Sequence, residues 1–183
     1  MAKPSAKTFS LDLDDLKGGA YGVTAALGEC YAQAASVCLE DQGHLSPTVM
    51  KVHADTGVSH ASISWGAVDD QMRRSWNDRE NATENGAYGI AILVVLKIKH
   101  LHVLEQSKKG TGFDYWLGSP DDEDAKFETK ARLEVSGIRK GSRALISGRV
   151  NQKLDQTKKS DGKHPAVVVV VEFGTPQTHV VDR

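Results

Sequence analysis

One stretch near the end of the chain consists almost entirely of β-branched residues. Residues 166–173 read Ala-Val-Val-Val-Val-Val-Glu-Phe. A strand with one wet face alternates apolar and polar residues, and this run has no such alternation. It therefore predicts a central strand that is buried on both faces, and Gly174, Thr175 and Pro176 are expected to end it. We expect an α/β (α+β) fold with a central mixed sheet built around this strand.

Two further strands are predicted upstream, and each carries a carboxylate. Asp114 lies in the strand that begins at residue 113, and Glu134 lies in the strand that begins near residue 127. Alternation in the second strand places Lys130, Arg132, Glu134 and Ser136 on one face. Carboxylates on neighbouring strands can hold a hard divalent cation such as Mg²⁺ through their oxygen atoms. The sequence therefore offers Asp114 and Glu134 as a candidate metal site.

A helix is predicted before these strands, over residues 80–98. Glu84 and Tyr88 fall on one stripe of this helix together with apolar residues, so Glu84 would extend an apolar face towards the sheet. A carboxylate in this place either meets a cation or stays in solvent in the first turn, and both interpretations remain open. Residues 90–96 are apolar all round, which leaves a strand as the alternative there.

A second helix is predicted between residues 139 and 160, with Ser142 as its cap. Residues 139–163 hold eight Lys or Arg and two Asp or Glu, a local net charge of +6, whereas the whole chain has −1. A basic helix directly after the Glu134 strand is suited to contact a phosphate backbone, and an ordinary solvated face is the equal alternative. The candidate nucleic-acid contacts are Arg139, Lys140, Arg143, Arg149 and Lys153.

The N-terminal part is expected to be helical. Residues 1–18 are predicted to be a flexible terminus and residues 19–78 a helical extension that includes a helix at 21–40. Residues 45–65 have the outline of a helix-turn-helix, with Ser46 as a cap and Gly57 in the turn. Its second helix has no Lys or Arg to hold phosphate, so a plain αα-hairpin is the favoured interpretation.

From residue 80 to 173 the predicted order is helix, strand, strand, strand, helix, strand. Its carboxylates are Glu84, Asp114 and Glu134. This order and placement resemble the PD-(D/E)XK, or restriction-endonuclease-like, superfamily, whose core is αβββαβ. The resemblance covers residues 79–176. Asp114 matches the first Asp of the family motif, although no Pro precedes it. Residues 134–136 match the following Asp/Glu-x-Lys, with Ser136 in the lysine position.

The resemblance implies a metal-dependent nuclease in which Glu84, Asp114 and Glu134 hold Mg²⁺ or Mn²⁺, with DNA expected ahead of RNA. A serine cannot supply the positive charge of the motif lysine. The substitute cation is therefore sought among Lys130, Arg132, Arg149 and Lys153. With no substitute, we expect a non-catalytic interaction or assembly subunit of the same fold. A bacterial defence complex or a homo-oligomer is the expected setting, and a helix-turn-helix DNA-binding regulator is the remaining alternative.

The first residues and the longest apolar runs indicate in which cellular compartment the protein is expected. Residues 1–7 carry no apolar core of a secretory signal, and the longest apolar runs are far too short to span a bilayer. A cytoplasmic protein without a membrane partner is therefore expected. Residues 177–183 are predicted to be a short tail.

Overall fold

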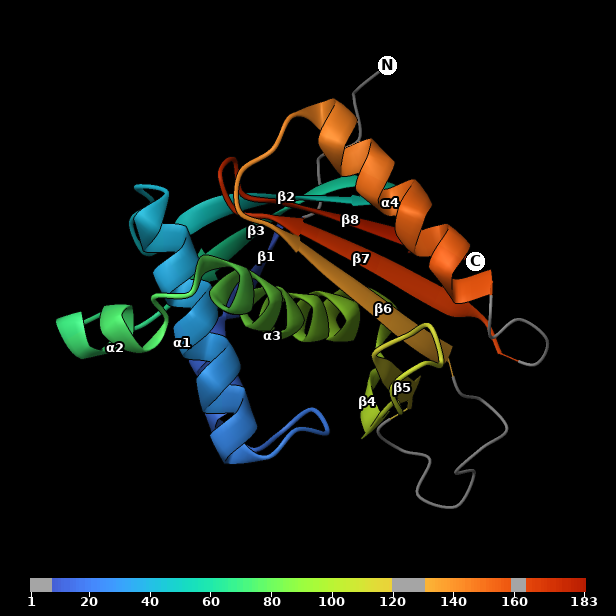
Figure 1. The fold of residues 1–183 in the computed structure, drawn as a ribbon, viewed down its shortest axis with the longest axis horizontal. Coiled ribbons are helices and arrows are strands. Elements are labelled where there is room, and N and C mark those ends of the chain that lie inside the picture. The colour runs from blue at the N-terminus through green and yellow to red at the C-terminus, as the bar shows by residue number, and fades with distance from the viewer. Residues whose placement is uncertain (1–7, 120–130, 159–163) are drawn as a thin grey trace.

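A computed structural model describes residues 8–119, 131–158 and 164–183 (Figure 1). Its helices lie on both faces of one large sheet. The elements in chain order are β1 (Thr8–Asp12), η1 (Leu13–Gly18), α1 (Ala25–Asp41), β2 (Thr48–Ala54), β3 (Gly57–Ser64), α2 (Asp70–Ser75), α3 (Arg79–Lys99), β4 (His102–Gln106), β5 (Tyr115–Gly118), β6 (Ala131–Ile138), α4 (Arg143–Thr157), β7 (Ala166–Glu172) and β8 (Gln177–Asp182).

The described strands form one eight-stranded sheet in the order β1-β3-β2-β8-β7-β6-β5-β4. The pairs β1/β3, β2/β8 and β6/β7 are parallel, and the other neighbouring pairs are antiparallel. The prediction of a mixed α/β fold with a central mixed sheet is therefore confirmed. α3 contacts β6 and β7 on one face, α1 lies beside α3, and α4 covers β6 and β7 on the opposite face (Figure 1).

β7 is the central strand that the valine run predicts, and every one of its residues is buried. Val167, Val169 and Val171 face the main core beneath α3, whereas Val168 and Val170 join a smaller core under α4. Burying both faces of such a strand is what favours helices on each side of the sheet.

Glu172, the last residue of β7, fixes the loop that leads into α4. Its buried carboxylate accepts hydrogen bonds from the N–H groups of Gly141, Gly174 and Thr175. Ser142 then caps α4 by accepting a hydrogen bond from the Leu145 N–H, as the sequence predicts. The start of α4 is thereby tied to the end of the central strand.

α3 is a helix over its full predicted length, so the strand alternative for residues 90–96 is wrong. Asp78 caps it by accepting a hydrogen bond from the Asn81 N–H. It packs closely against α1 because small residues line the contact. A Cβ atom added to Gly86 would lie 2.9 Å from the backbone of Ala35, so a larger residue there would push the two helices apart.

Residues 45–65 contain neither a helix-turn-helix nor an αα-hairpin, and that prediction is wrong. β2 and β3 form an antiparallel hairpin in this stretch. Met50 and Val52 point into the core with Ala61 and Ile63, while the residues between them are more exposed. Alternation of burial with a period of two is the mark of a half-buried strand rather than a helix.

Both ends of the described chain are also more ordered than the sequence suggests. Residues 8–18 form β1 and the short helix η1 instead of a flexible terminus, and residues 1–7 lie outside the described part. Residues 177–182 are not a tail, because β8 pairs with both β7 and β2. Residues 19–78 contribute β2 and β3 to this same sheet, so they are not a purely helical extension. No helix among the described residues has the length and hydropathy to cross a membrane.

Candidate functional site

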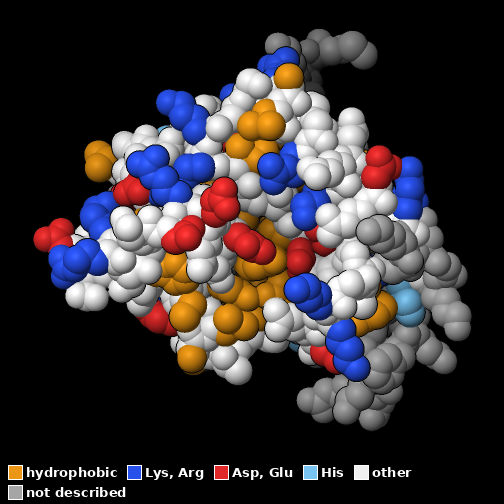
Figure 2. Space-filling model, in the orientation of Figure 1, with side chains coloured by type: hydrophobic (Ala, Val, Ile, Leu, Met, Phe, Trp, Pro, Cys, Tyr) orange, Lys and Arg blue, Asp and Glu red, His pale blue; other side chains and the backbone are white. Residues whose placement is uncertain are grey.

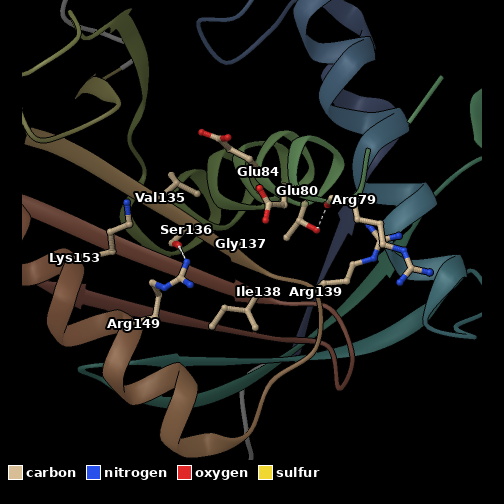
Figure 3. A pocket seen from close by; sticks show the side chains of 11 residues that line it. Arg79, Glu80, Glu84, Val135, Ser136, Gly137, Ile138, Arg139, Arg149 and Lys153 are labelled. Carbon is tan, nitrogen blue, oxygen red and sulfur yellow. Dashed lines mark hydrogen bonds between the residues drawn. The ribbon is translucent and has the colours of Figure 1, made fainter. Parts of the chain in front are cut away.

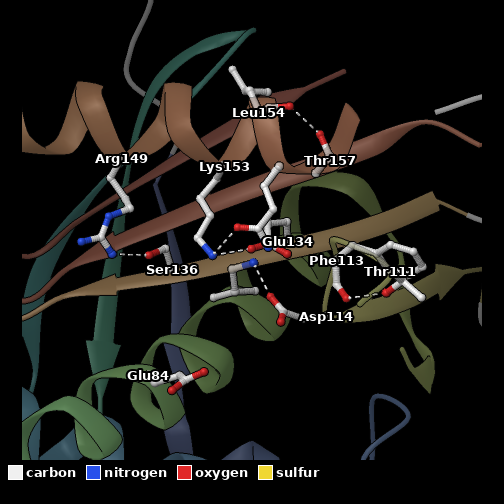
Figure 4. Close-up of polar contacts among 12 residues, drawn as sticks. Glu84, Thr111, Phe113, Asp114, Glu134, Ser136, Arg149, Lys153, Leu154 and Thr157 are labelled. Atoms are coloured by element: carbon white, nitrogen blue, oxygen red, sulfur yellow. Dashed lines mark hydrogen bonds and ion pairs between the residues drawn. The ribbon is translucent and has the colours of Figure 1, made fainter. Parts of the chain in front are cut away.

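Polar residues of β6 meet α4 at three successive points, and Figure 4 shows the contacts that Arg149 and Lys153 make. Arg149 donates to Ser136 Oγ at 2.8 Å, Lys153 contacts Glu134 Oε1 at 2.5 Å, and the Arg132 guanidinium donates to the Thr157 carbonyl at 3.0 Å. Four residues of helix advance about 6 Å and two residues of strand advance about 6.6 Å. The two spacings match, so α4 runs antiparallel to β6 with one contact at each step. We call this set of three contacts the α4–β6 ladder.

Asp114 lies at the point where the pairing of β6 with β5 ends, while β6 stays paired with β7 on its other side. β5 pairs with β6 only at residues 131–133, and Asp114 directly precedes β5. Its N–H donates to the Leu133 carbonyl, and its Oδ2 accepts a hydrogen bond from the Val135 N–H at 2.7 Å. The carboxylate therefore takes the place of a strand residue and is held next to Glu134.

The two carboxylates share a poorly hydrated environment, and the side chain of Glu134 is only 1 % exposed. Burial, followed by the negative charge of Asp114, raises the pKa of Glu134 to about 7, and the contact with Lys153 opposes this rise. Burial also raises the pKa of Asp114, against the lowering effects of the Val135 N–H and of Lys153. Two buried acids side by side favour binding a proton or a cation.

One oxygen of this pair has no partner within the described protein. Glu134 Oε1 is paired with Lys153, whereas Glu134 Oε2 is buried and makes no hydrogen bond. A buried carboxylate oxygen without a donor is costly unless a proton, a water molecule or a metal ion satisfies it. Hard oxygen donors at this position fit Mg²⁺ or Mn²⁺.

Glu84 reaches the carboxylate pair through Tyr88. The Tyr88 hydroxyl lies 3.2 Å from Glu84 Oε1 and 3.2 Å from Asp114 Oδ1, so it can donate to either oxygen. Burial and the two nearby carboxylates raise the pKa of Tyr88, which keeps the hydroxyl protonated. Glu84 is exposed, and no group of three or more His, Cys, Asp or Glu is placed to hold a metal within the described ranges. A metal at Asp114 and Glu134 would therefore need water or substrate oxygens as well.

The other residues named from the sequence are spread more widely. Arg132 lies on the ladder face but points away from Ser136, towards the carbonyls of Thr157 and His164. Arg139 is paired with Asp41 on α1. Lys140 and Arg143 are exposed at the start of α4 and do not line the pocket described next, and Lys130 lies outside the described residues.

A pocket of about 560 Å³ runs along residues 135–138 of β6, between α3 and α4 (Figure 3). Arg149 and Lys153 line it from α4, and Arg79, Glu80 and Glu84 line it from α3. On the molecular surface, acidic side chains gather over the N-terminal half of α3 and basic ones over α4 (Figure 2). Asp114 and Glu134 do not line this pocket, but Lys153, which contacts Glu134, does.

Three residues of this region were not among the candidates from the sequence. Arg79 and Glu80 are the first residues of α3, and no local motif marks them. Tyr88 has a signal, because it lies four residues after Glu84 and therefore on the same side of a helix. A hydroxyl one helical turn from a candidate carboxylate could have been assigned a supporting role.

Comparison with known proteins does not add to this picture. No family model, no curated protein and no solved structure matches the chain. A function must therefore be inferred from the geometry of three features, which are the α4–β6 ladder, the carboxylate pair and the pocket.

Proposed function

We propose that the protein is a metal-dependent nuclease with a restriction-endonuclease-like core. The order α3-β4-β5-β6-α4-β7 supports this, with β4, β5 and β6 antiparallel and with α4 joining the parallel strands β6 and β7. The observation that carries the proposal is the contact of Lys153 with Glu134, directly beside Asp114. This contact places an ammonium group beside the two carboxylates. It thereby supplies the positive charge that Ser136, in the lysine position of the motif, cannot provide.

Asp114 and Glu134 are the residues that would hold Mg²⁺ or Mn²⁺, with Glu134 Oε2 as the free oxygen and Glu84 as an outer contact. When bound, such an ion supplies a water of lowered pKa and neutralises charge on the phosphate. Tyr88 and the Val135 N–H hold the two oxygens of Asp114 in a fixed orientation. A fixed carboxylate needs no reorganisation during reaction, which is how preorganised groups lower a barrier.

Lys153 takes the role proposed for the missing motif lysine. Its ammonium group comes from α4 rather than from β6, and its side chain is 18 % exposed, at the wall of the pocket. A positive charge there can stabilise the negative charge that develops on a phosphate oxygen. Gln156 Oε1 accepts a second hydrogen bond from the same ammonium group and helps to orient it.

A second candidate function is that of a non-catalytic subunit with the same fold. The observation in its favour is that Lys153 already neutralises Glu134, while the described residues include no three-ligand metal group. In that case the pair is a structural element, and the protein acts through a partner or a second copy. The two candidates differ in whether the isolated chain hydrolyses nucleic acid.

The test is cleavage of supercoiled plasmid DNA, followed by RNA, with Mg²⁺ or Mn²⁺ and with EDTA as the blank. Wild type is expected to nick the plasmid, and Glu134→Gln and Lys153→Met are each expected to lose about 100-fold or more in rate. Lys158→Met is the matched control, because it removes an exposed charge that is paired with Asp155 at the far end of α4. Equal cleavage by wild type and Glu134→Gln would contradict the proposal. Absence of cleavage with either metal would favour the assembly subunit.

A further inference from the structure

Arg149 differs from Lys153 and Arg139, two other basic residues that line the pocket, in the partner that holds it. Lys153 is paired with Glu134 and Arg139 with Asp41, and both of these partners are carboxylates. Arg149 instead donates to the neutral hydroxyl of Ser136. Within the described ranges no carboxylate forms an ion pair with Arg149, so its charge stays available for an anion from outside.

The Ser136 hydroxyl fixes where this charge lies. Ser136 is 8 % exposed and sits on a central strand, so its position is set by the sheet. The contact joins it to a half-buried arginine one turn of α4 before Lys153. Because the ladder advances about 6 Å at each step, the Arg149 guanidinium lies one step along β6 from the Lys153–Glu134 contact.

The pocket gives this guanidinium access to a ligand. Arg149 lines the cavity on the α4 side, and Arg79 lines it from the first turn of α3. Glu80 and Glu84 line the α3 side as well, but the Glu84 carboxylate points away from Arg149 (Figure 3) and lies within hydrogen-bond distance of the Tyr88 hydroxyl. An anion is therefore favoured against β6 and α4 rather than against α3.

We infer that Arg149, held by Ser136, forms a phosphate subsite that is separate from the carboxylate pair. Its ligand is a phosphate group next to the one that is cleaved, either an internal phosphodiester or a terminal phosphate. A strand carries one phosphate for each nucleotide, so a strand that lies along β6 presents a second phosphate beside the first. An arginine is suited to this role because its planar guanidinium can donate two hydrogen bonds to phosphate oxygens. The assignment of the ligand to a nucleic-acid strand depends on the proposed nuclease function.

The experiment measures binding without catalysis. A fluorescein-labelled single-stranded oligothymidylate is titrated with protein in EDTA, over a series of potassium chloride concentrations, and anisotropy gives the affinity. Arg149→Gln is expected to weaken binding about tenfold and to lower the slope of log affinity against log salt by about 0.7. Lys158→Gln, which removes a charge outside the pocket, is expected to leave the affinity within about twofold of wild type.

Ser136 variants separate position from charge. Ser136→Ala keeps the guanidinium but loses its anchor, so affinity is expected to fall while the salt slope changes little. Ser136→Thr keeps a hydroxyl and is expected to restore binding. If Ser136→Ala binds as tightly as wild type, the anchoring role is wrong. Circular dichroism of each variant checks that the fold is retained.

Oligonucleotides that differ in one phosphate identify the source of the ligand. Terminal phosphates are removed or added at each end, and single internal phosphodiesters are replaced by uncharged methylphosphonates. The effect of Arg149→Gln is expected to disappear for the one probe that lacks the bound phosphate. Wild-type affinity and salt slope in Arg149→Gln, or failure of wild type to bind at all, would overturn the subsite. Arg149-dependent binding without metal-dependent cleavage would instead overturn the nuclease and leave the subsite standing.

Discussion

β6 and β7 are adjacent, parallel and both buried, yet they are built from opposite kinds of residue. Residues 167–171 of β7 are all valine, whereas residues 132, 134 and 136 of β6 are Arg, Glu and Ser. All three of these β6 side chains meet α4, while Val168 and Val170 fill a small apolar core under the same helix. Apolar burial in β7 therefore stabilises the fold. The charged and polar side chains of β6 offset part of this stabilisation, because such groups are costly to bury. The contrast is what the proposed function would explain, because a polar face on a buried strand is costly to the fold.

The largest expected effect comes from giving β7 the character of β6. Val169 is fully buried beneath α3. Val169→Glu is expected to destabilise the fold by at least about 4 kcal/mol, because a buried charge without a partner costs several kcal/mol. Urea unfolding followed by circular dichroism measures it. Val169→Ile is the control and is expected to cost less than about 1.5 kcal/mol. A Val169→Glu protein as stable as wild type would show that β7 tolerates charge as β6 does.

The next effect is the pH dependence that the carboxylate pair of β6 creates. The folded protein holds a proton on Glu134 more tightly than the unfolded chain does, because burial raises its pKa from 4.5 to about 7. The resulting contribution to stability is full below pH 4.5 and is lost as the pH rises through about 7, with a total change of about 3 kcal/mol.

The free energy of unfolding in urea, measured from pH 4 to pH 8, tests this pH dependence. Glu134→Gln cannot titrate, so the difference in stability between it and wild type is expected to change by the same amount over this range. A constant difference would mean that the pKa of Glu134 is not raised in the folded protein. Only the polar strand is expected to show this behaviour, since β7 has no titratable residue before Glu172.

A smaller effect is expected when the ladder is made apolar like β7. Replacing Glu134 and Lys153 together by leucine removes a buried ion pair, which is expected to stabilise the fold by about 2 kcal/mol. Lys153→Leu alone is expected to be destabilising at pH 8, because the buried Glu134 loses its cationic partner and must either stay charged or take up a proton at that pH. Thermal and urea unfolding measure both variants. Destabilisation by the double replacement would show that the pair is retained for stability rather than for function.

The strongest local patterns in the sequence predicted much of the core. The valine run predicted β7, Ser142 marked the start of α4, and the stripe with Glu84 and Tyr88 belongs to a helix. Each of these signals depends on residues close together in the chain, so no distant contact was needed to interpret it. Alternation in β6 also placed Arg132, Glu134 and Ser136 correctly on one face.

The stretch 45–65 was misinterpreted because two local signals competed. Ser46 followed by Pro47 is typical of a helix start, and Gly57 is compatible with a turn between helices. The alternation of Met50 and Val52 with exposed residues predicts strands, and a short turn at residues 55–56 joins the two halves of a hairpin. Pairing with β8 and β1 decides the outcome, and those partners come from the two ends of the chain.

The sequence limited the basic residue that contacts Glu134 to a few candidates, but it could not identify which of them makes the contact. Lys153 was one of four candidates, because the rotation of α4 about its axis depends on the loop that Glu172 ties down. Arg132 was an equal candidate on the same strand face, yet its long side chain reaches carbonyl groups near the end of α4. Contacts between a helix and a strand depend on tertiary geometry that alternation within the strand does not contain.

The matched spacing of α4 and β6 has a consequence for how related sites are recognised. A short motif assumes that a cation and its carboxylate partner are neighbours in the chain, but Lys153 contacts Glu134 and follows it by 19 residues. Either element can deliver a positive charge to the same point, because four residues of helix and two residues of strand advance by about the same 6 Å. A search for similar sites should therefore look for polar residues at every second position of a strand. These are matched with polar residues at every fourth position of the following helix, and the helix runs antiparallel to the strand.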